Sequence, residues 1–97
     1  MMQSQTAVRT DEPAVFYSKT GCPWCNAVRH LLNEHDVAYE ERNVRRDPQQ
    51  RHALEEQTQQ AETPTLRIGD EWLVDTDAKA VAKRLRLPEP AEVKKAA

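Results

Sequence analysis

The most constraining feature of this sequence is the segment KTGCPWC at residues 19–25, which contains both cysteines of the chain. A short, mostly apolar run with β propensity, residues 14–17, precedes it, and a run with helical periodicity follows it. The segment therefore connects a predicted strand to a predicted helix through a tight turn. Two cysteines in a CxxC spacing at such a junction are typical of a redox-active dithiol.

The position of each cysteine predicts its role. Pro23 suits the first helical residue, where a missing N–H costs nothing, so Cys22 falls at the N-cap beside free backbone N–H groups. These groups and the helix dipole favour a negative charge, and Lys19 adds a positive one, so the pKa of Cys22 should fall below the free-thiol value of ~8.5. Cys25 lies one turn further on the same face, with its Cα ~5–6 Å from that of Cys22. We expect Cys22 to attack a disulfide and Cys25 to resolve the mixed disulfide that forms.

A zinc site and a structural disulfide are the main alternative uses of a CxxC pair. A structural zinc site needs four ligands, and only His30, His35 and His52 are available to join the cysteines. The spacing matches no common zinc motif, and a continuous helix would direct the two pairs of ligands apart. A structural disulfide across so short a loop constrains the unfolded chain little. The sequence therefore predicts a redox pair and no bound metal.

Length and composition bound the class of protein. A chain of 97 residues makes one domain with a modest core. Its net charge of −2 gives no electrostatic case for binding nucleic acid or an anionic membrane, and no apolar run approaches the ~20 residues that span a bilayer. The polar start of the chain lacks the features of a secretory signal, and a single CxxC pair fits a reducing compartment. We expect a cytoplasmic monomer with no nucleic-acid or membrane partner.

Turn signals and hydrophobic periodicity divide the chain into a flexible lead-in at residues 1–12, one domain at 13–87 and a charged tail at 88–97. The strands expected within the domain are short and partly apolar, and they cover residues 13–18, 37–44, 63–68 and 71–74. A two-residue turn at Gly69-Asp70 joins the last two strands as a hairpin.

Three helices are expected, at residues 23–35, at residues 48–60 and after a cap at 75–77. The first has an apolar stripe formed by Trp24, Ala27, Val28, Leu31 and Leu32, and the last has one formed by Ala78, Val81, Ala82 and Leu85. The second helix has an N-cap at Asp47 with Gln50 completing a capping box, but its thin apolar content predicts weak packing. The order β-α-β-α-β-β-α predicts an α/β sandwich with helices on both faces of a mixed four-stranded sheet.

With these elements in place, the chain resembles a glutaredoxin of the thioredoxin-fold superfamily. The resemblance rests on Tyr17-Ser18-Lys19 followed by the CPWC dithiol, where the family usually has tyrosine in place of Trp24, and on Thr63-Pro64 at the position of the family's cis-proline. It covers residues 13–87 and implies a thioredoxin-like fold, a cis peptide bond before Pro64 and thiol–disulfide oxidoreductase activity.

The resemblance also implies which residues bind the substrate or the reducing thiol. Besides the catalytic Cys22 and Cys25, the implied binding residues are Tyr17, Lys19, Pro23, Trp24, Thr63, Pro64, Thr76 and Asp77. The family opens its last helix with Gly-Gly-x-Asp, whereas this chain has Val74-Asp75-Thr76-Asp77, so the Thr76 backbone and Asp77 match and the two glycines do not. No cofactor is expected to stay bound, and the implied reductant is glutathione or another low-molecular-weight thiol.

Three functions follow, in order of preference. The first is reduction of mixed disulfides or protein disulfides, with a small thiol or a flavin-dependent reductase restoring the dithiol. The second is a redoxin that donates electrons to ribonucleotide reductase and is itself reduced by a flavin-dependent reductase. The third is an iron–sulfur carrier, in which Cys22 and an external thiol hold a cluster between two subunits. Family members that carry clusters more often lack the second cysteine, so Cys25 argues against this third function.

Overall fold

The computed structural model describes residues 12–88 and residue 90 and shows a mixed four-stranded sheet with three helices. The elements follow the order β1 (Ala14–Ser18), α1 (Pro23–Glu34), β2 (Tyr39–Asn43), α2 (Pro48–Thr58), β3 (Thr65–Ile68), β4 (Glu71–Leu73) and α3 (Ala78–Leu85). The strands lie in the order β2-β1-β3-β4, with β1 parallel to β2 and the other pairs antiparallel. The predicted thioredoxin-like α/β sandwich is confirmed.

The predicted lead-in and tail fall almost entirely on residues 1–11, 89 and 91–97, which lie outside the described residues. Among the helices that the structure does describe, none has the length and apolar character needed to cross a membrane.

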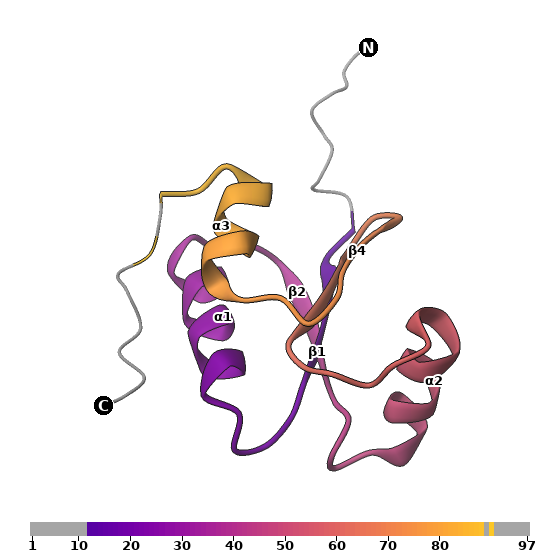
Figure 1. The fold of residues 1–97 in the computed structure, drawn as a ribbon. Coiled ribbons are helices and arrows are strands. Elements are labelled where there is room, and N and C mark those ends of the chain that lie inside the picture. The colour runs from indigo at the N-terminus through magenta and orange to yellow at the C-terminus, as the bar shows by residue number, and fades with distance from the viewer. Residues whose placement is uncertain (1–11, 89, 91–97) are drawn as a thin grey trace.

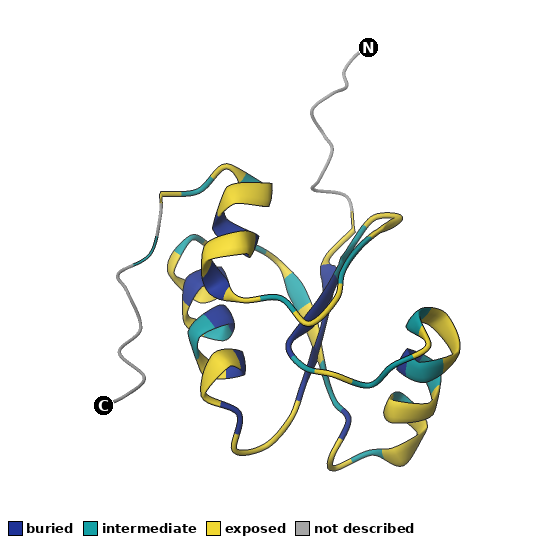
Figure 2. Ribbon diagram, viewed as in Figure 1, coloured by how far each residue is buried: buried dark blue, intermediate teal, exposed yellow. Residues whose placement is uncertain are grey.

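Strand β1 is the centre of the molecule, and its side chains alternate between two cores. Ala14 and Phe16 face α1 and α3, while Val15 and Tyr17 face α2. Figure 1 shows the resulting layers, with α1 and α3 on one side of the sheet and α2 on the other. All five residues of β1 are buried (Figure 2), as expected for a strand covered on both faces.

The two cores differ in size. The core under α1 and α3 includes Val28, Leu31, Leu32 and Val81, whereas Leu54 is the only residue of α2 that is buried. Leu54 packs with Val15, Tyr17 and Val44, and the rest of α2 is largely exposed (Figure 2). The predicted weak packing of the second helix is confirmed.

Two local predictions need correction. The second strand covers five residues and not 37–44, because the Val37 N–H donates to the Leu32 carbonyl at the end of α1 and does not join the sheet. The capping box at α2 does not form. Asp47 accepts a hydrogen bond from the Gln49 N–H as predicted for an N-cap, but its own N–H donates to the Asn43 carbonyl. The Gln50 side chain donates to the Asp47 carboxylate instead.

The single buried anchor of α2 makes a stability prediction. Leu54→Ala should lower the free energy of unfolding by about 2–5 kcal/mol, because the lost methyl groups leave a cavity in a small core. The same substitution at Leu85, which is only partly buried in α3, is the matched control and should cost less. Denaturant unfolding measures both losses, and hydrogen exchange should show that Leu54→Ala loosens the amides of α2 first. Equal losses in the two variants would contradict the assignment.

Candidate active site

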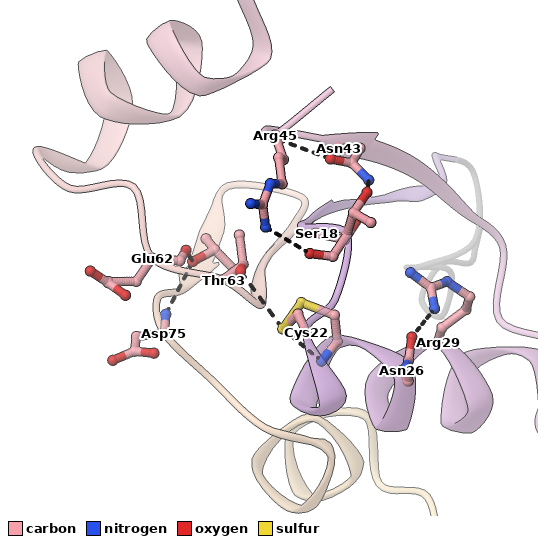
Figure 3. Close-up of a disulfide and its surroundings, with 12 residues drawn as sticks. Ser18, Cys22, Asn26, Arg29, Asn43, Arg45, Glu62, Thr63 and Asp75 are labelled. Carbon is pink, nitrogen blue, oxygen red and sulfur yellow. Dashed lines mark hydrogen bonds between the residues drawn. A yellow bond between two sulfur atoms is a disulfide. The ribbon is translucent and has the colours of Figure 1, made fainter. Parts of the chain in front are cut away.

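The two cysteines are joined as a disulfide at the start of α1 (Figure 3). Cys22 is the N-cap of the helix, and its sulfur accepts a hydrogen bond from the Cys25 N–H at 3.1 Å. Cys22 is 7% exposed and Cys25 is fully buried, and their Cα atoms are 5.2 Å apart, within the predicted range. The cysteine that an incoming disulfide can reach is therefore Cys22, with Pro23 directly after it at the first helical position.

The turn that leads into the dithiol depends on Gly21. This residue has φ +83°, in the left-handed region where a side chain is strained, so glycine is needed to bring the chain from β1 to the N-cap. The turn is held from outside by the end of β2. The Asn43 side chain donates to the Thr20 hydroxyl at 3.0 Å, and the Arg45 guanidinium donates to the Thr20 carbonyl at 3.4 Å.

The Thr63–Pro64 peptide bond is cis, as the resemblance implies. It places the Thr63 hydroxyl 3.8 Å from the Cys22 sulfur, to which it donates a weak hydrogen bond (Figure 3). Among the described residues, neither the N–H nor the C=O of Thr63 takes part in a backbone hydrogen bond. The segment before β3 therefore presents open backbone groups beside the reactive sulfur, where an extended peptide can pair with them.

A groove of about 510 Å³ lies on the α2 side of the dithiol. Its lining includes Lys19 from the loop before Cys22, Arg45 from the loop after β2, Arg51 from the first turn of α2, and Glu62, the residue before Thr63. Arg51 is paired with Glu55 at 3.1 Å. Arg45 is not among the site residues that the sequence predicts. The feature that would have indicated Arg45 is the parallel pairing of β1 and β2, because it brings the carboxyl ends of both strands, and the residues that follow them, to one edge of the sheet.

The segment 74–77, on the other flank of the dithiol, differs from what the resemblance implies. The Thr76 N–H donates to the Pro64 carbonyl at 2.8 Å, so this backbone group already has a partner within the protein. Asp75 has φ +52°, and its N–H donates to the Thr65 hydroxyl at 3.1 Å. The Asp77 carboxylate caps α3 by accepting from the Ala80 N–H at 2.8 Å.

Two aromatic residues lie elsewhere than predicted. Trp24 does not belong to the buried stripe of α1, because it is 44% exposed between the two cysteines. Its place in the sequence pattern is correct, but the residues of α1 that are buried are Cys25, Val28, Leu31 and Leu32. Tyr17 is buried on the α2 side, where its ring stacks on Trp72 and its hydroxyl accepts from Arg42 at 3.2 Å. Tyr17 therefore packs in the core on the α2 side of the sheet.

Within residues 12–88, no group of three or more histidine, cysteine or acidic side chains is arranged to hold a metal ion. Two of the histidines that a zinc site would need lie on exposed helix faces. His30 pairs with Glu34 at 3.6 Å and His52 pairs with Glu56 at 3.3 Å, both one turn apart on their own helices.

Comparison with known proteins agrees with this geometry. The glutaredoxin family model matches residues 14–73, which is more than half of the chain. No curated protein matches the sequence.

Solved structures share the fold. A point mutant of the thioredoxin-like protein BC3987 is 29% identical, with a TM-score of 0.68 over 74% of this chain and 97% of that one. The glutaredoxin-like protein NrdH-redoxin from Escherichia coli is 22% identical, with a TM-score of 0.64 over 81% and 100%. A glutaredoxin from Archaeoglobus fulgidus is 13% identical, with a TM-score of 0.66 over 79% and 89%, so these last two show likeness of fold alone.

The position of Cys22 leads to a prediction about its ionisation. In the reduced protein the pKa of Cys22 should lie below ~8.5, because the helix N-terminus favours the thiolate. Lys19→Gln should raise this pKa slightly, since an exposed charge acts through solvent, and Lys83→Gln on the far end of α3 is the control. Ultraviolet absorbance of the thiolate against pH measures both effects. A Cys22 pKa at or above the free-thiol value would refute the prediction.

Proposed function

Because the chain belongs to the glutaredoxin family, we propose that it is a thiol–disulfide oxidoreductase that reduces mixed or protein disulfides through Cys22 and Cys25. The observation that carries this proposal is the asymmetry of the dithiol, in which Cys22 is the N-cap of α1 and keeps 7% exposure, while Cys25 is fully buried one turn behind it. An asymmetric pair separates the attacking sulfur from the resolving sulfur, as the chemistry of disulfide exchange requires.

The proposed reaction has two steps. The Cys22 thiolate attacks one sulfur of the substrate disulfide, forming a mixed disulfide and releasing the other substrate sulfur as a thiolate. Cys25 then loses its proton and attacks the Cys22 sulfur, which forms the Cys22–Cys25 disulfide and releases the reduced substrate. The N–H groups of the first helical turn and the Thr63 hydroxyl stabilise negative charge on Cys22 in each step.

Substrate binding in this proposal uses both flanks of the dithiol. The open backbone groups of Thr63 pair with an extended peptide next to the target cysteine, while Lys19 and Arg45 attract an acidic group on the same ligand. Trp24 and Val74, which are 44% and 40% exposed, add apolar contacts.

Two observations favour a second candidate, in which a flavin-dependent reductase and not glutathione restores the dithiol. The Thr76 N–H is occupied by the Pro64 carbonyl, and Val74 and Asp75 stand where the family has two glycines. A redoxin that serves ribonucleotide reductase is one protein of this type. Glutathione would meet a β-branched side chain and a carboxylate on this flank, so we expect it to bind weakly.

Substitution of each cysteine tests the assignment of roles. Cys22→Ser should abolish reductase activity, because no other accessible thiol remains. Cys25→Ser should retain part of the turnover on a small mixed disulfide, where an external thiol replaces Cys25, but lose most reduction of protein disulfides. Steady-state turnover on both substrate types measures this difference. Equal residual activity in the two variants would show that the roles are wrongly assigned.

The reductant is tested with a Val74→Gly/Asp75→Gly double variant. Asp75 already adopts a left-handed conformation, so glycine fits there without a change of backbone. We expect the wild type to saturate poorly with glutathione and to turn over better with another thiol or with thioredoxin reductase and NADPH. The double variant should have a several-fold lower KM for glutathione. If the wild type saturates at cellular glutathione levels and the double variant is no better, the argument from the missing glycines fails.

A further inference from the structure

A chain of polar contacts connects the end of β1 to the first turns of α1 through a carboxylate on β2. The Ser18 hydroxyl donates to Glu41 Oε2 at 2.6 Å, and the Arg29 guanidinium donates to both oxygens of Glu41, at 2.6 and 2.9 Å. A further Arg29 nitrogen donates to the Asn26 side chain at 2.6 Å (Figure 3). We call Ser18, Asn26, Arg29 and Glu41 the brace.

The brace is partly withdrawn from solvent and stays charged at neutral pH. Ser18 is fully buried, and the side chains of Arg29 and Glu41 are about two-thirds buried. The hydrogen bonds from Arg29 hold the pKa of the Glu41 carboxyl below its ordinary value, and Glu41 in turn raises the pKa of Arg29. The Arg29 guanidinium also lies over the Phe16 ring, with 5.8 Å between its central carbon and the ring centroid.

In the sequence, residues of the brace lie on both sides of the active-site segment. Ser18 is the last residue of β1, directly before the loop that carries Cys22, and Asn26 directly follows Cys25. Arg29 lies one turn after Cys25 on α1. The polar contacts thus connect the residues on both sides of the dithiol to one carboxylate, which is fixed in the sheet by the pairing of Glu41 with Phe16.

The start of α1 contributes Cys22 and Cys25 to the core, with Ala27 packed against it, and the larger apolar side chains follow later in the helix. The buried residues of the helix are Cys25, Val28, Leu31 and Leu32, so the apolar face anchors mainly the later turns, and Trp24 in the first turn is exposed. A disulfide tolerates only a narrow range of Cα separation and direction, so a shift of the first turn by an ångström changes how readily Cys25 reaches Cys22. The brace contacts the first two turns of α1, where it can keep the helix from shifting relative to β1.

We propose that Glu41 is a positioning residue for the resolving step, because it holds the first two turns of α1 against β1 so that the Cys25 sulfur is aligned with Cys22. In that step Cys25 loses its proton to solvent and its sulfur bonds to the Cys22 sulfur. The bond between Cys22 and the substrate sulfur breaks, and the substrate leaves as a thiolate that takes up a proton. Cys25 is oxidised and the substrate sulfur is reduced. The proposal rests on the proposed disulfide reductase function.

The test compares Glu41→Gln with Glu40→Gln. Both residues lie on β2, but Glu40 pairs with Val15 in the register and faces the other side of the sheet. Its carboxylate accepts a hydrogen bond from Arg42 and takes no part in the brace. The equilibrium between dithiol and disulfide is measured against a dithiothreitol buffer for each variant. Glu41→Gln should weaken the Cys22–Cys25 disulfide about tenfold, which is ~30 mV in reduction potential for a two-electron couple. Glu40→Gln should leave the equilibrium within twofold of the wild type.

A second measurement separates positioning from general loss of stability. Reduction of protein disulfides needs Cys25, and Glu41→Gln should lower this rate relative to the wild type. Turnover on a small mixed disulfide by Cys25→Ser does not need Cys25, and adding Glu41→Gln to Cys25→Ser should lower that rate by a smaller factor. A structural role alone lowers both rates by the same factor. Arg29→Lys, which keeps the charge but loses the two-pronged contact, should shift the disulfide equilibrium in the same direction and provides the test if Glu41→Gln does not fold.

Three results would overturn the proposal. The first is a change of less than twofold in the disulfide equilibrium in both Glu41→Gln and Arg29→Lys. The second is a change of similar size in Glu40→Gln, and the third is an equal fall of the two rates. The disulfide equilibrium needs no substrate. A protein without reductase activity but with the expected shift would therefore refute the proposed function and leave the positioning role in place.

Discussion

The backbone N–H groups that the start of α1 directs toward Cys22 are the feature on which the rest of the structure depends. One of them, from Cys25, donates to the Cys22 sulfur, so the helix itself provides the environment that favours a thiolate. The surrounding elements bring further groups to this point from distant parts of the sequence. The cis bond before Pro64 delivers the Thr63 hydroxyl, and the end of β2 delivers Arg45 to the loop before Cys22.

The two flanks of the dithiol differ in chemistry. The groove on the α2 side is lined by three cations, Lys19, Arg45 and Arg51, and two anions, Glu55 and Glu62, whereas the opposite flank presents Val74 and Asp75. A ligand that places an acidic group in the groove is attracted, while one that places an acidic group against Asp75 is repelled. The groove wall also includes α2, which is anchored by a single buried leucine. Elements with few buried contacts open most readily, so α2 is the wall of this groove that the core holds least firmly.

Much of the fold followed from patterns within a few residues of one another. The CxxC pair after an apolar run, the N-caps at Cys22, Asp47 and Asp77, and the turn at Gly69 are all local, and all appear in the structure. The capping box at Gln50 was wrong for a reason of longer range, because the Asp47 N–H had a partner in Asn43 at the end of β2. Periodicity also identified the thin apolar face of α2, and in the structure Leu54 is the one residue of this helix that is buried.

By itself, the sequence determined the position of the dithiol at a helix N-terminus, the order of the elements and the family resemblance, because each depends on residue types at short and regular spacing. Only the tertiary structure decided that Trp24 is exposed, that the Thr76 N–H is occupied and that Ser18, Arg29 and Glu41 form the brace. Each of these depends on which face of the sheet an element covers and on contacts between residues far apart in the chain. Hydrophobic periodicity shows that a face is apolar or polar, but it does not show what packs against that face.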